Sequence, residues 1–164
     1  MKQHEDTGAG AAARGEGREA LLLRAGGLAF AVYAEECEAL TAWAEPAPLP
    51  SAPPSVLGVT PVRGRMRTVL DPARLFEAAG QADAGLRPTA PRLVVSLAGD
   101  EQLALAVETS EAVTLHPDEA TDAPSPALPA RAAFTRGGET VHLLDPARLF
   151  DAAMSGAERR RRRT

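Results

Sequence analysis

The side chains that most often carry chemistry are few and scattered in this sequence. The histidines are His4, His116 and His142, and the single cysteine is Cys37. A zinc site needs several His, Cys or carboxylate ligands at short spacings, and these residues lack such neighbours. Cys37 also has no histidine at the spacing of a catalytic pair and no second cysteine for a disulfide. We therefore predict no metal site and no cofactor, a structural His142, and a buried, unreactive Cys37.

Anion binding is the other chemistry that the sequence offers. Residues 136–139 read RGGE, but the stretch lacks the lysine and the following helix of a phosphate-binding loop. Helices are expected to begin at Asp71 and Asp145, and free amides at a helix start attract anions. The two aspartates already place a carboxylate there, which opposes a second anion. No enzyme site emerges from these residues, and we predict that the protein is not an enzyme.

The charge of the chain is divided between an acidic body and a basic end. The formal net charge is −4, and five of the 18 basic residues form the run Arg159–Arg163. Without this run, 13 basic residues stand against 22 acidic ones. An acidic body argues against nucleic acid as a partner, because phosphate backbones bind basic faces. We expect residues 155–164 to be a solvated, disordered basic tail, with polyanion binding by this tail as the weaker alternative.

The N-terminal segment and the lengths of the apolar runs indicate where in the cell the protein is expected to be. Residues 1–19 are rich in Gly, Ala and charged residues without periodicity, so we expect a disordered tail there. The first residues also lack the apolar core of a signal peptide. No run approaches the ~18 apolar residues that are needed to span a bilayer. We expect a cytoplasmic protein without direct membrane insertion.

The hexapeptide DPARLF occurs twice, at residues 71–76 and again 74 positions later at 145–150. Asp suits a helix N-cap and Pro suits the first helical position, so each copy predicts a short helix. Phe76 and Phe150 are the aromatic residues of these two helices. We expect the two rings to plug the end of a β unit or to meet at a shared seam.

The segments upstream of the two hexapeptides also match each other. LAFAV at 28–32 corresponds to LALAV at 103–107, and each follows a turn signal. A proline-rich loop and a second hairpin come next in both copies. Each copy therefore predicts four or five short strands closed by a short helix. Short strands with regular turns indicate small barrels, so we expect an all-β fold with related halves at about 20–80 and 90–154, packed side by side.

The stretch VLGVTPVRGRMRTVLDPARLF at 56–76 resembles a pattern of the CheW-like family, the adaptor proteins of bacterial chemotaxis. Members often have an apolar pair, then Gly-Val-x-Asn-Leu-Arg-Gly, then a strand that ends in Asp and a short helix. Here residues 58–64 occupy the motif without a gap. The resemblance covers about residues 20–154. It implies two five-stranded, SH3-like β-barrels packed around a shared hydrophobic region, with a short helix at the end of each half.

The resemblance also implies a function without catalysis. Family members bridge the cytoplasmic tips of methyl-accepting chemoreceptors to the regulatory domain of the histidine kinase CheA. Arg63 matches the family arginine implicated in this coupling, and Val62, Gly64 and Gly58 belong to the same motif. A guanidinium at a hairpin end can make forked, charge-assisted bonds to a partner. We expect these four residues to bind partners, and the protein to be a chemotaxis adaptor, or scaffold.

The chain departs from the family pattern at several positions. The family's Val-x-Glu-Ile reads Cys37-Glu38-Ala39-Leu40, which displaces the acidic side chain. The motif asparagine is Pro61, which we expect to remove a donor from the strand ladder. Two glycines of the second unit are replaced by Ala132 and Phe134. These departures keep a second hypothesis open, namely a divergent CheW-like interaction module in a non-chemotaxis signalling complex.

Overall fold

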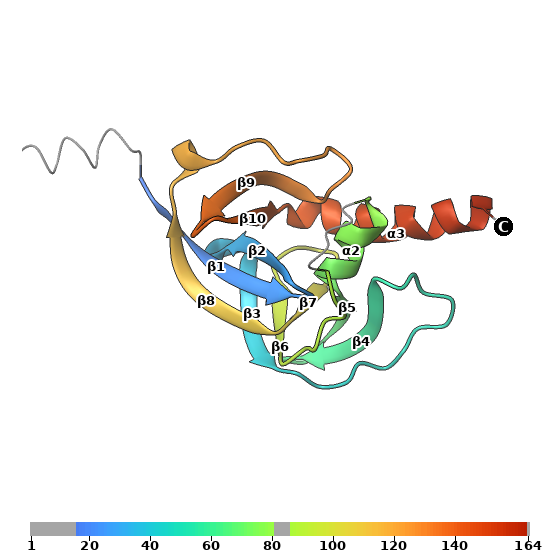
Figure 1. The fold of residues 1–164 in the computed structure, drawn as a ribbon. Helices are drawn as coiled ribbons and strands as arrows, with labels where there is room; N and C mark the ends of the chain where they lie inside the picture. Colours follow the sequence, from blue (N-terminus) through green and yellow to red (C-terminus); the bar gives the residue numbers. More distant parts are fainter. Residues whose placement is uncertain (1–15, 81–85, 164) are drawn as a thin grey trace, which may run out of the picture.

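The computed structural model describes residues 16–80 and 86–163, with side chains described as far as residue 155. They form a mostly β structure of two five-stranded sheets and two α-helices (Figure 1). The strands are β1 (Arg18–Ala25), β2 (Leu28–Tyr33), β3 (Cys37–Ala42), β4 (Val56–Val62), β5 (Arg65–Leu70), β6 (Leu93–Leu97), β7 (Leu103–Val107), β8 (Thr109–Leu115), β9 (Ala130–Arg136) and β10 (Glu139–Leu144). The helices are α2 (Pro72–Ala78) and α3 (Pro146–Arg163), with short 3-10 turns η1 (Ala34–Glu36) and η2 (Pro117–Glu119). Most of the expected N-terminal tail, residues 1–19, lies outside the described residues, and β1 already begins at Arg18.

Strand β2 lies in the middle of its sheet, and both of its faces are buried. The large residues Leu28, Phe30 and Val32 enter one hydrophobic core. The alanines Ala29 and Ala31 enter another. Side chains alternate between the two faces of a strand, so the pattern LAFAV sends its large and small residues to opposite sides. The burial of β2 follows this alternation.

The order of strands differs from the expected one β unit per sequence copy. Sheet A has the order β8-β1-β2-β10-β9, and sheet B has the order β3-β6-β7-β5-β4. Each sheet takes its first hairpin from one copy and its other three strands from the other copy. The parallel pairs β2–β10 and β5–β7 join the copies within each sheet. The expectation of two self-contained units side by side is therefore wrong, and the halves 20–80 and 90–154 describe the duplication rather than the sheets.

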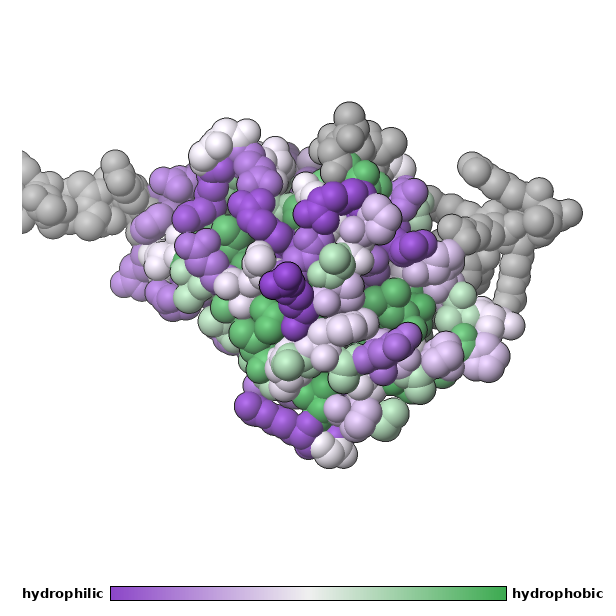
Figure 2. Space-filling model, turned by 60° about the horizontal axis from the view of Figure 1, so that its bottom comes forward, coloured by the Kyte–Doolittle hydropathy of each residue, from purple (hydrophilic) through white to green (hydrophobic). Residues whose placement is uncertain are grey.

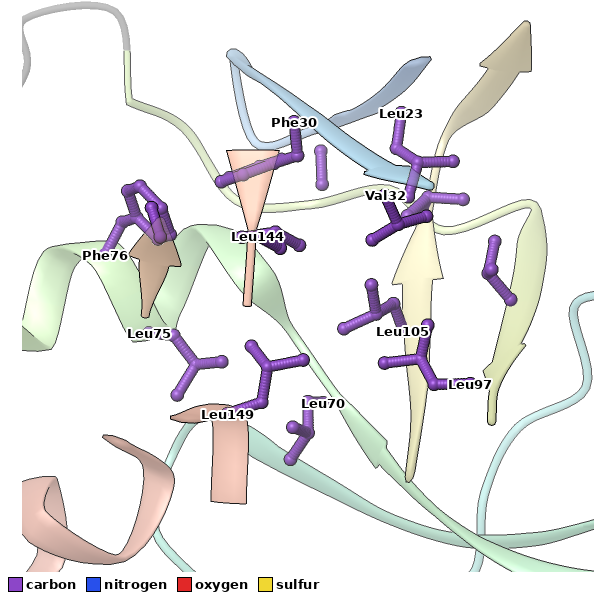
Figure 3. Close-up of a cluster of buried hydrophobic side chains, with 14 of the residues drawn as sticks. Leu23, Phe30, Val32, Leu70, Leu75, Phe76, Leu97, Leu105, Leu144 and Leu149 are labelled. Carbon is purple, nitrogen blue, oxygen red and sulfur yellow. The ribbon is translucent and has the colours of Figure 1, made fainter. Parts of the chain in front are cut away.

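The buried apolar side chains of the described residues form three hydrophobic cores. The largest is shared by both sheets, and its side chains converge from strands and helices of both copies (Figure 3). The strands of each sheet also contribute to a smaller core that is rich in alanine and valine. The small core of sheet A consists of Ala20, Leu22, Ala29, Ala31, Tyr33, Val113, Leu115, Phe134, Val141 and Leu143. That of sheet B consists of Ala39, Val62, Val69, Val94, Ala104 and Ala106.

Both hexapeptides start a helix, as predicted. The Asp71 carboxylate accepts a hydrogen bond from the Ala73 amide at 3.1 Å, and Asp145 accepts one from the Ala147 amide at 3.2 Å. α2 ends at Ala78, but α3 continues to Arg163 and points away from the sheets (Figure 1). Alanine, glutamate and arginine, which dominate this extension, are good helix formers. The expectation of a disordered C-terminal tail is wrong for the backbone of residues 155–163.

The two phenylalanines of the hexapeptides have different environments. Phe76 is 0% exposed, and its ring lies edge-to-face against Phe30 at 4.9 Å and His142 at 4.7 Å between centroids. Phe150 is 44% exposed on α3. Phe76 therefore fills the shared core as expected, and the same expectation is wrong for Phe150. The packing of His142 among these rings agrees with its expected structural role.

Candidate partner-binding surface

The turn between β4 and β5 consists of Arg63 and Gly64, whose φ angles are 51° and 81°. A two-residue hairpin of the I′ type requires positive φ at both positions. Glycine meets this requirement without steric cost, whereas an arginine in the left-handed region costs about 1 kcal/mol. Arg63 is exposed, and no ion pair joins it to another described residue. A strained position thus presents a free cation at the end of the hairpin.

The matching turn between β9 and β10 has the same backbone conformation. Its residues, Gly137 and Gly138, have φ angles of 55° and 78°. The first copy of the duplication therefore keeps an arginine where the second copy has the glycine that the turn favours. Strain that persists at such a position points to a use for the side chain.

The other expected site residues lie behind this turn. Val62 is buried in the small core of sheet B and anchors the end of the hairpin. Gly58 lies near the opposite end of β4 with a φ of 145°, and a Cβ there would stand 2.2 Å from the Ala47 carbonyl oxygen. Ala47 and Val59 exchange backbone hydrogen bonds of 2.8 and 2.9 Å. Glycine at position 58 thus allows the proline-rich loop to close on β4, and the structure brings only residues 62–64 of the four together.

Pro61 was expected to remove a hydrogen bond from the strand ladder, and the register shows that it does not. Val59 directs its backbone groups outward to Ala47. Outward-facing residues alternate along an edge strand, so Pro61 faces outward too, where no ladder partner exists. β4 is an edge strand of sheet B. The expectation is therefore wrong, and the proline instead protects the edge from pairing with another chain.

Sequence reasoning missed a buried arginine in the same hairpin. Arg67 of β5 is 3% exposed, donates to the Leu97 carbonyl oxygen at 2.9 Å and forms an ion pair with Glu38. The register of β3 shifts between Cys37 and Ala39, and such a bulge re-aims the side chain between them. The Glu38 carboxylate therefore turns toward the guanidinium and ties β3 to β5. The one sequence signal was a charged residue on the inward face of the strand RMRTVL.

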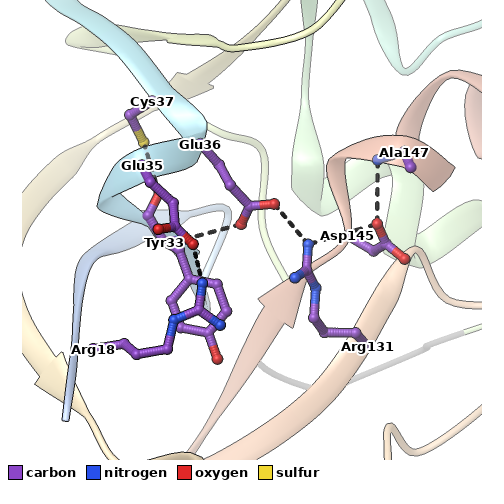
Figure 4. A network of polar contacts seen from close by, with 8 residues as sticks. All are labelled: Arg18, Tyr33, Glu35, Glu36, Cys37, Arg131, Asp145 and Ala147. Carbon is purple, nitrogen blue, oxygen red and sulfur yellow. Dashed lines mark hydrogen bonds and ion pairs between the residues drawn. The ribbon is translucent and has the colours of Figure 1, made fainter. Parts of the chain in front are cut away.

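A second group of charged residues lies at one end of sheet A (Figure 4). Arg131 contacts Glu36 at 2.7 Å and Asp145 at 3.6 Å, which links η1 to the start of α3. The Arg18 guanidinium stacks on the Tyr33 ring at 3.5 Å from its centroid. These cations already have partners within the chain. They stabilise the fold and, unlike the turn arginine, leave no charge free for a partner protein.

Cys37 was expected to be buried, and the structure places it half-buried against the shared core. Its sulfur lies 3.6 Å from the Tyr33 carbonyl oxygen. Burial and the nearby Glu36 carboxylate raise the pKa of the Cys37 thiol to about 11. The thiol is consequently protonated at neutral pH, and a thiol is a poor nucleophile compared with a thiolate.

No group of three or more His, Cys, Asp or Glu residues in the described part of the chain is arranged to hold a metal ion. None of the described helices combines the length and the apolar character needed to cross a membrane. The exposed end of the β4–β5 hairpin, residues 61–66, carries Arg63 at positive φ and is the candidate partner-binding surface.

Comparison with known proteins agrees with the two-sheet architecture. The family model described as the CheW-like domain matches residues 19–154. The crystal structure of scaffolding protein TtCheW from Thermoanaerobacter tengcongensis is similar, with a TM-score of 0.66 and 13% sequence identity over 82% of this chain and 88% of that chain. No curated protein matches the chain in sequence. Because the family model spans most of the chain and the fold agrees, the chain belongs to the CheW-like family of chemotaxis adaptor and scaffold proteins.

Proposed function

We propose that the protein is a non-enzymatic adaptor that couples chemoreceptors to a CheA-type histidine kinase. The proposed partners are the regulatory domain of the kinase and the cytoplasmic tip of a methyl-accepting receptor, and the proposed location is the cytoplasm. Membership of the CheW-like family supports this assignment, since family members interact with both partners. The observation that carries it is the exposed Arg63, held in a left-handed conformation that glycine would adopt without strain.

The proposed contact of Arg63 is a carboxylate on the partner. A guanidinium offers several donors in a planar fork, and a bidentate bond to a carboxylate is stronger than a bond between neutral groups. The tight turn and the buried Val62 behind it restrict the backbone from which the side chain extends. A restricted backbone lowers the entropy lost when the side chain binds.

We also propose that each sheet curls into the SH3-like barrel that the family resemblance implies. The small core of each sheet contains residues from all five of its strands, as the interior of a closed sheet would. The shared core then marks the seam between two barrels. In the proposed assembly, one of these barrels packs against a barrel of the kinase regulatory domain.

The test is binding of the purified full-length chain to the regulatory domain of its host's CheA-type kinase, measured by biolayer interferometry. Arg63→Gly is the informative variant, because it removes the guanidinium while relieving strain in the turn. We expect it to weaken binding by about tenfold or more, the loss typical of a central arginine contact. Arg63→Glu should abolish binding. Kinase activity with receptor membranes present gives a second, functional readout.

The matched control is Arg136→Ala, because Arg136 is an exposed arginine beside the equivalent turn of sheet A. We expect this variant to bind like the unaltered chain. If the unaltered chain binds neither the kinase domain nor the receptor tip, the proposed function is wrong. If Arg63→Gly binds as tightly as the unaltered chain, Arg63 is not the contact.

The runner-up is a divergent module of the same family that serves a signalling complex outside chemotaxis. One observation favours it: the acidic residue of β3, Glu38, is engaged by Arg67 within the chain. The two functions differ in the proteins that co-purify from the host. Recovery of a receptor and a CheA-type kinase supports the adaptor, and recovery of an unrelated kinase without receptors supports the alternative.

A further inference from the structure

We infer that the end of the β4–β5 hairpin is a two-sided wedge that selects a partner cleft with one acidic wall and one apolar wall. Arg65 faces the acidic wall, the pair Pro61–Met66 faces the apolar wall, and Arg63 lies in the turn between them. The inference rests on the proposed function, because it names the partner chemistry recognised at the same hairpin.

The apolar side of the wedge follows from the strand register. Pro61 pairs with Met66 across the hairpin. Because the residues next to the turn form a hydrogen-bonded pair, Pro61 and Met66 form the next, non-bonded pair, whose Cα atoms lie about 4.5 Å apart. Their side chains therefore stand close together on one face. Met66 is 56% exposed and Pro61 is exposed as well.

Methionine suits a binding surface of this kind. Its unbranched, polarisable side chain adapts to irregular apolar partners, and the rigid proline beside it loses little entropy on contact. A single exposed apolar residue needs no explanation, but a neighbouring pair at the end of a hairpin forms a continuous apolar contact. On the face of the molecule that comes forward in Figure 2, hydrophobic and hydrophilic surface are interleaved.

The cationic side of the wedge is formed by Arg65. It pairs with Val62 and shares the face of Val62 and Arg67, opposite to the apolar pair. Arg65 is exposed and, like Arg63, has no ion pair with the described residues. Arg67, two residues further along the strand, is buried and already paired with Glu38. Two free guanidinium groups thus lie at the end of a chain body that is acidic overall, and carboxylates complement them.

The equivalent hairpin of sheet A has neither the apolar pair nor an arginine at the position of Arg65. Thr135 and Thr140 replace the apolar pair. Glu139 replaces Arg65, and it is paired with Arg24 at 2.8 Å. The duplicated fold therefore does not require these features, which belong to the first copy alone. The second hairpin supplies the residues with which to test them.

Calorimetry with the kinase regulatory domain at low and high NaCl concentration tests the two walls separately. Arg65→Gln should weaken binding about tenfold at low salt and reduce its salt dependence, because one of two screened charges is lost. Met66→Thr, which imports the residue of the second hairpin, should weaken binding about tenfold and leave the salt dependence unchanged. Thr140→Met is the matched control in sheet A and should bind like the unaltered chain. Unfolding midpoints of all variants should match, since these side chains are exposed.

The outcomes separate this inference from the proposed function. If Arg63→Gly loses binding while Arg65→Gln and Met66→Thr bind like the unaltered chain, the wedge is refuted and the adaptor function stands. If Arg65→Gln and Met66→Thr both lose binding but show the same change in salt dependence, the two walls are not distinct and the wedge is refuted. If the unaltered chain binds neither the kinase domain nor the receptor tip, both the function and the wedge are refuted.

Discussion

The two hairpins that follow the proline-rich loops have the same backbone and different surfaces. Both turns place two residues at positive φ, and both strands before them form one bridge to the preceding loop, Ala47–Val59 in one and Thr121–Ala133 in the other. The second hairpin has two glycines at its turn, and its Glu139 is paired within the chain. The first carries a strained arginine in its turn, and its Arg65 has no ion pair with the described residues. The backbone geometry that the two hairpins share is required by the fold. The side chains that differ between them are not required by the fold, and they mark the candidate partner-binding surface.

The same comparison applies to the two helices. Phe76 packs on the parallel pair Phe30–His142 of sheet A. At the positions that match Phe30 and His142, the second and first copies have Leu105 and Thr68, and neither side chain offers a ring. An aromatic pair contributes more than its buried area alone, and the phenylalanine of the hexapeptide is buried in the copy where aromatic side chains are present to pack against it.

The largest expected effect separates these two phenylalanines. Phe76→Ala should lower the free energy of unfolding by about 3–5 kcal/mol, because it empties a fully buried site. Phe150→Ala should lower it by less than about 1 kcal/mol, since the side chain is half exposed. Urea unfolding followed by circular dichroism measures both values. Equal losses of unfolding free energy would show that the two phenylalanines are packed alike, which would contradict the structure.

The next effect concerns an inward-facing strand position. This position is Arg67 in β5 of the first copy and Val141 in β10 of the second copy. Glu38→Ala should destabilise the fold by about 3 kcal/mol, because it leaves a buried guanidinium without its anion. Arg67→Val should cost less, about 1 kcal/mol, because a buried charge is replaced by an apolar residue that the second copy tolerates.

The double variant Glu38→Ala/Arg67→Val is the control for this pair. Its stability should resemble that of Arg67→Val alone, since Glu38 has no role once the guanidinium is gone. Additive losses from the two changes, measured by urea unfolding, would show that Glu38 stabilises the fold in another way.

Opposite substitutions in the two hairpin turns should change the stability of the protein in opposite directions. Arg63→Gly should stabilise the protein by about 1 kcal/mol, because it removes the left-handed strain, and Gly137→Arg should destabilise it by about the same amount. Thermal unfolding monitored by calorimetry measures both. Arg65→Gly serves as control, because position 65 lies in a strand, where glycine is destabilising. A loss of stability in Arg63→Gly would mean that the arginine side chain stabilises the fold.

The smallest expected effect concerns the two helix caps and depends on pH. Burial raises the pKa of Asp71, although hydrogen bonds from Thr89 and from the helix amides oppose this shift. A carboxyl whose pKa is higher in the folded state contributes stability below its unfolded pKa of about 3.9, and this contribution is lost as pH rises through the folded pKa.

The variant Asp71→Asn keeps the capping oxygen and removes the titration. The stability of the unaltered chain relative to Asp71→Asn should therefore fall as pH rises from about 3 to 7, which unfolding curves at several pH values measure. Asp145→Asn, at the less buried cap, is the comparison. A relative stability that rises with pH would contradict the raised pKa of Asp71.

Local features of the structure were predictable from the sequence. The hairpin around Gly26 and Gly27, the alternation in β2 and the helix starts at Asp71 and Asp145 all depend on neighbouring residues. The candidate turn at Arg63 was also found by its motif, but its left-handed conformation was not. The ion pair of Arg67 was missed because a bulge in another strand aims Glu38 at it.

The sequence by itself determined where strands, turns and helices begin, because backbone preferences and side-chain alternation act over a few residues. It also revealed the duplication and, through it, the positions at which the copies differ. Only the tertiary structure decided that the copies exchange hairpins between two sheets, that one of two identical phenylalanines is buried, and that the edge proline interrupts no ladder. These outcomes depend on pairing between segments far apart in the chain, and no local pattern encodes which distant partner a strand meets.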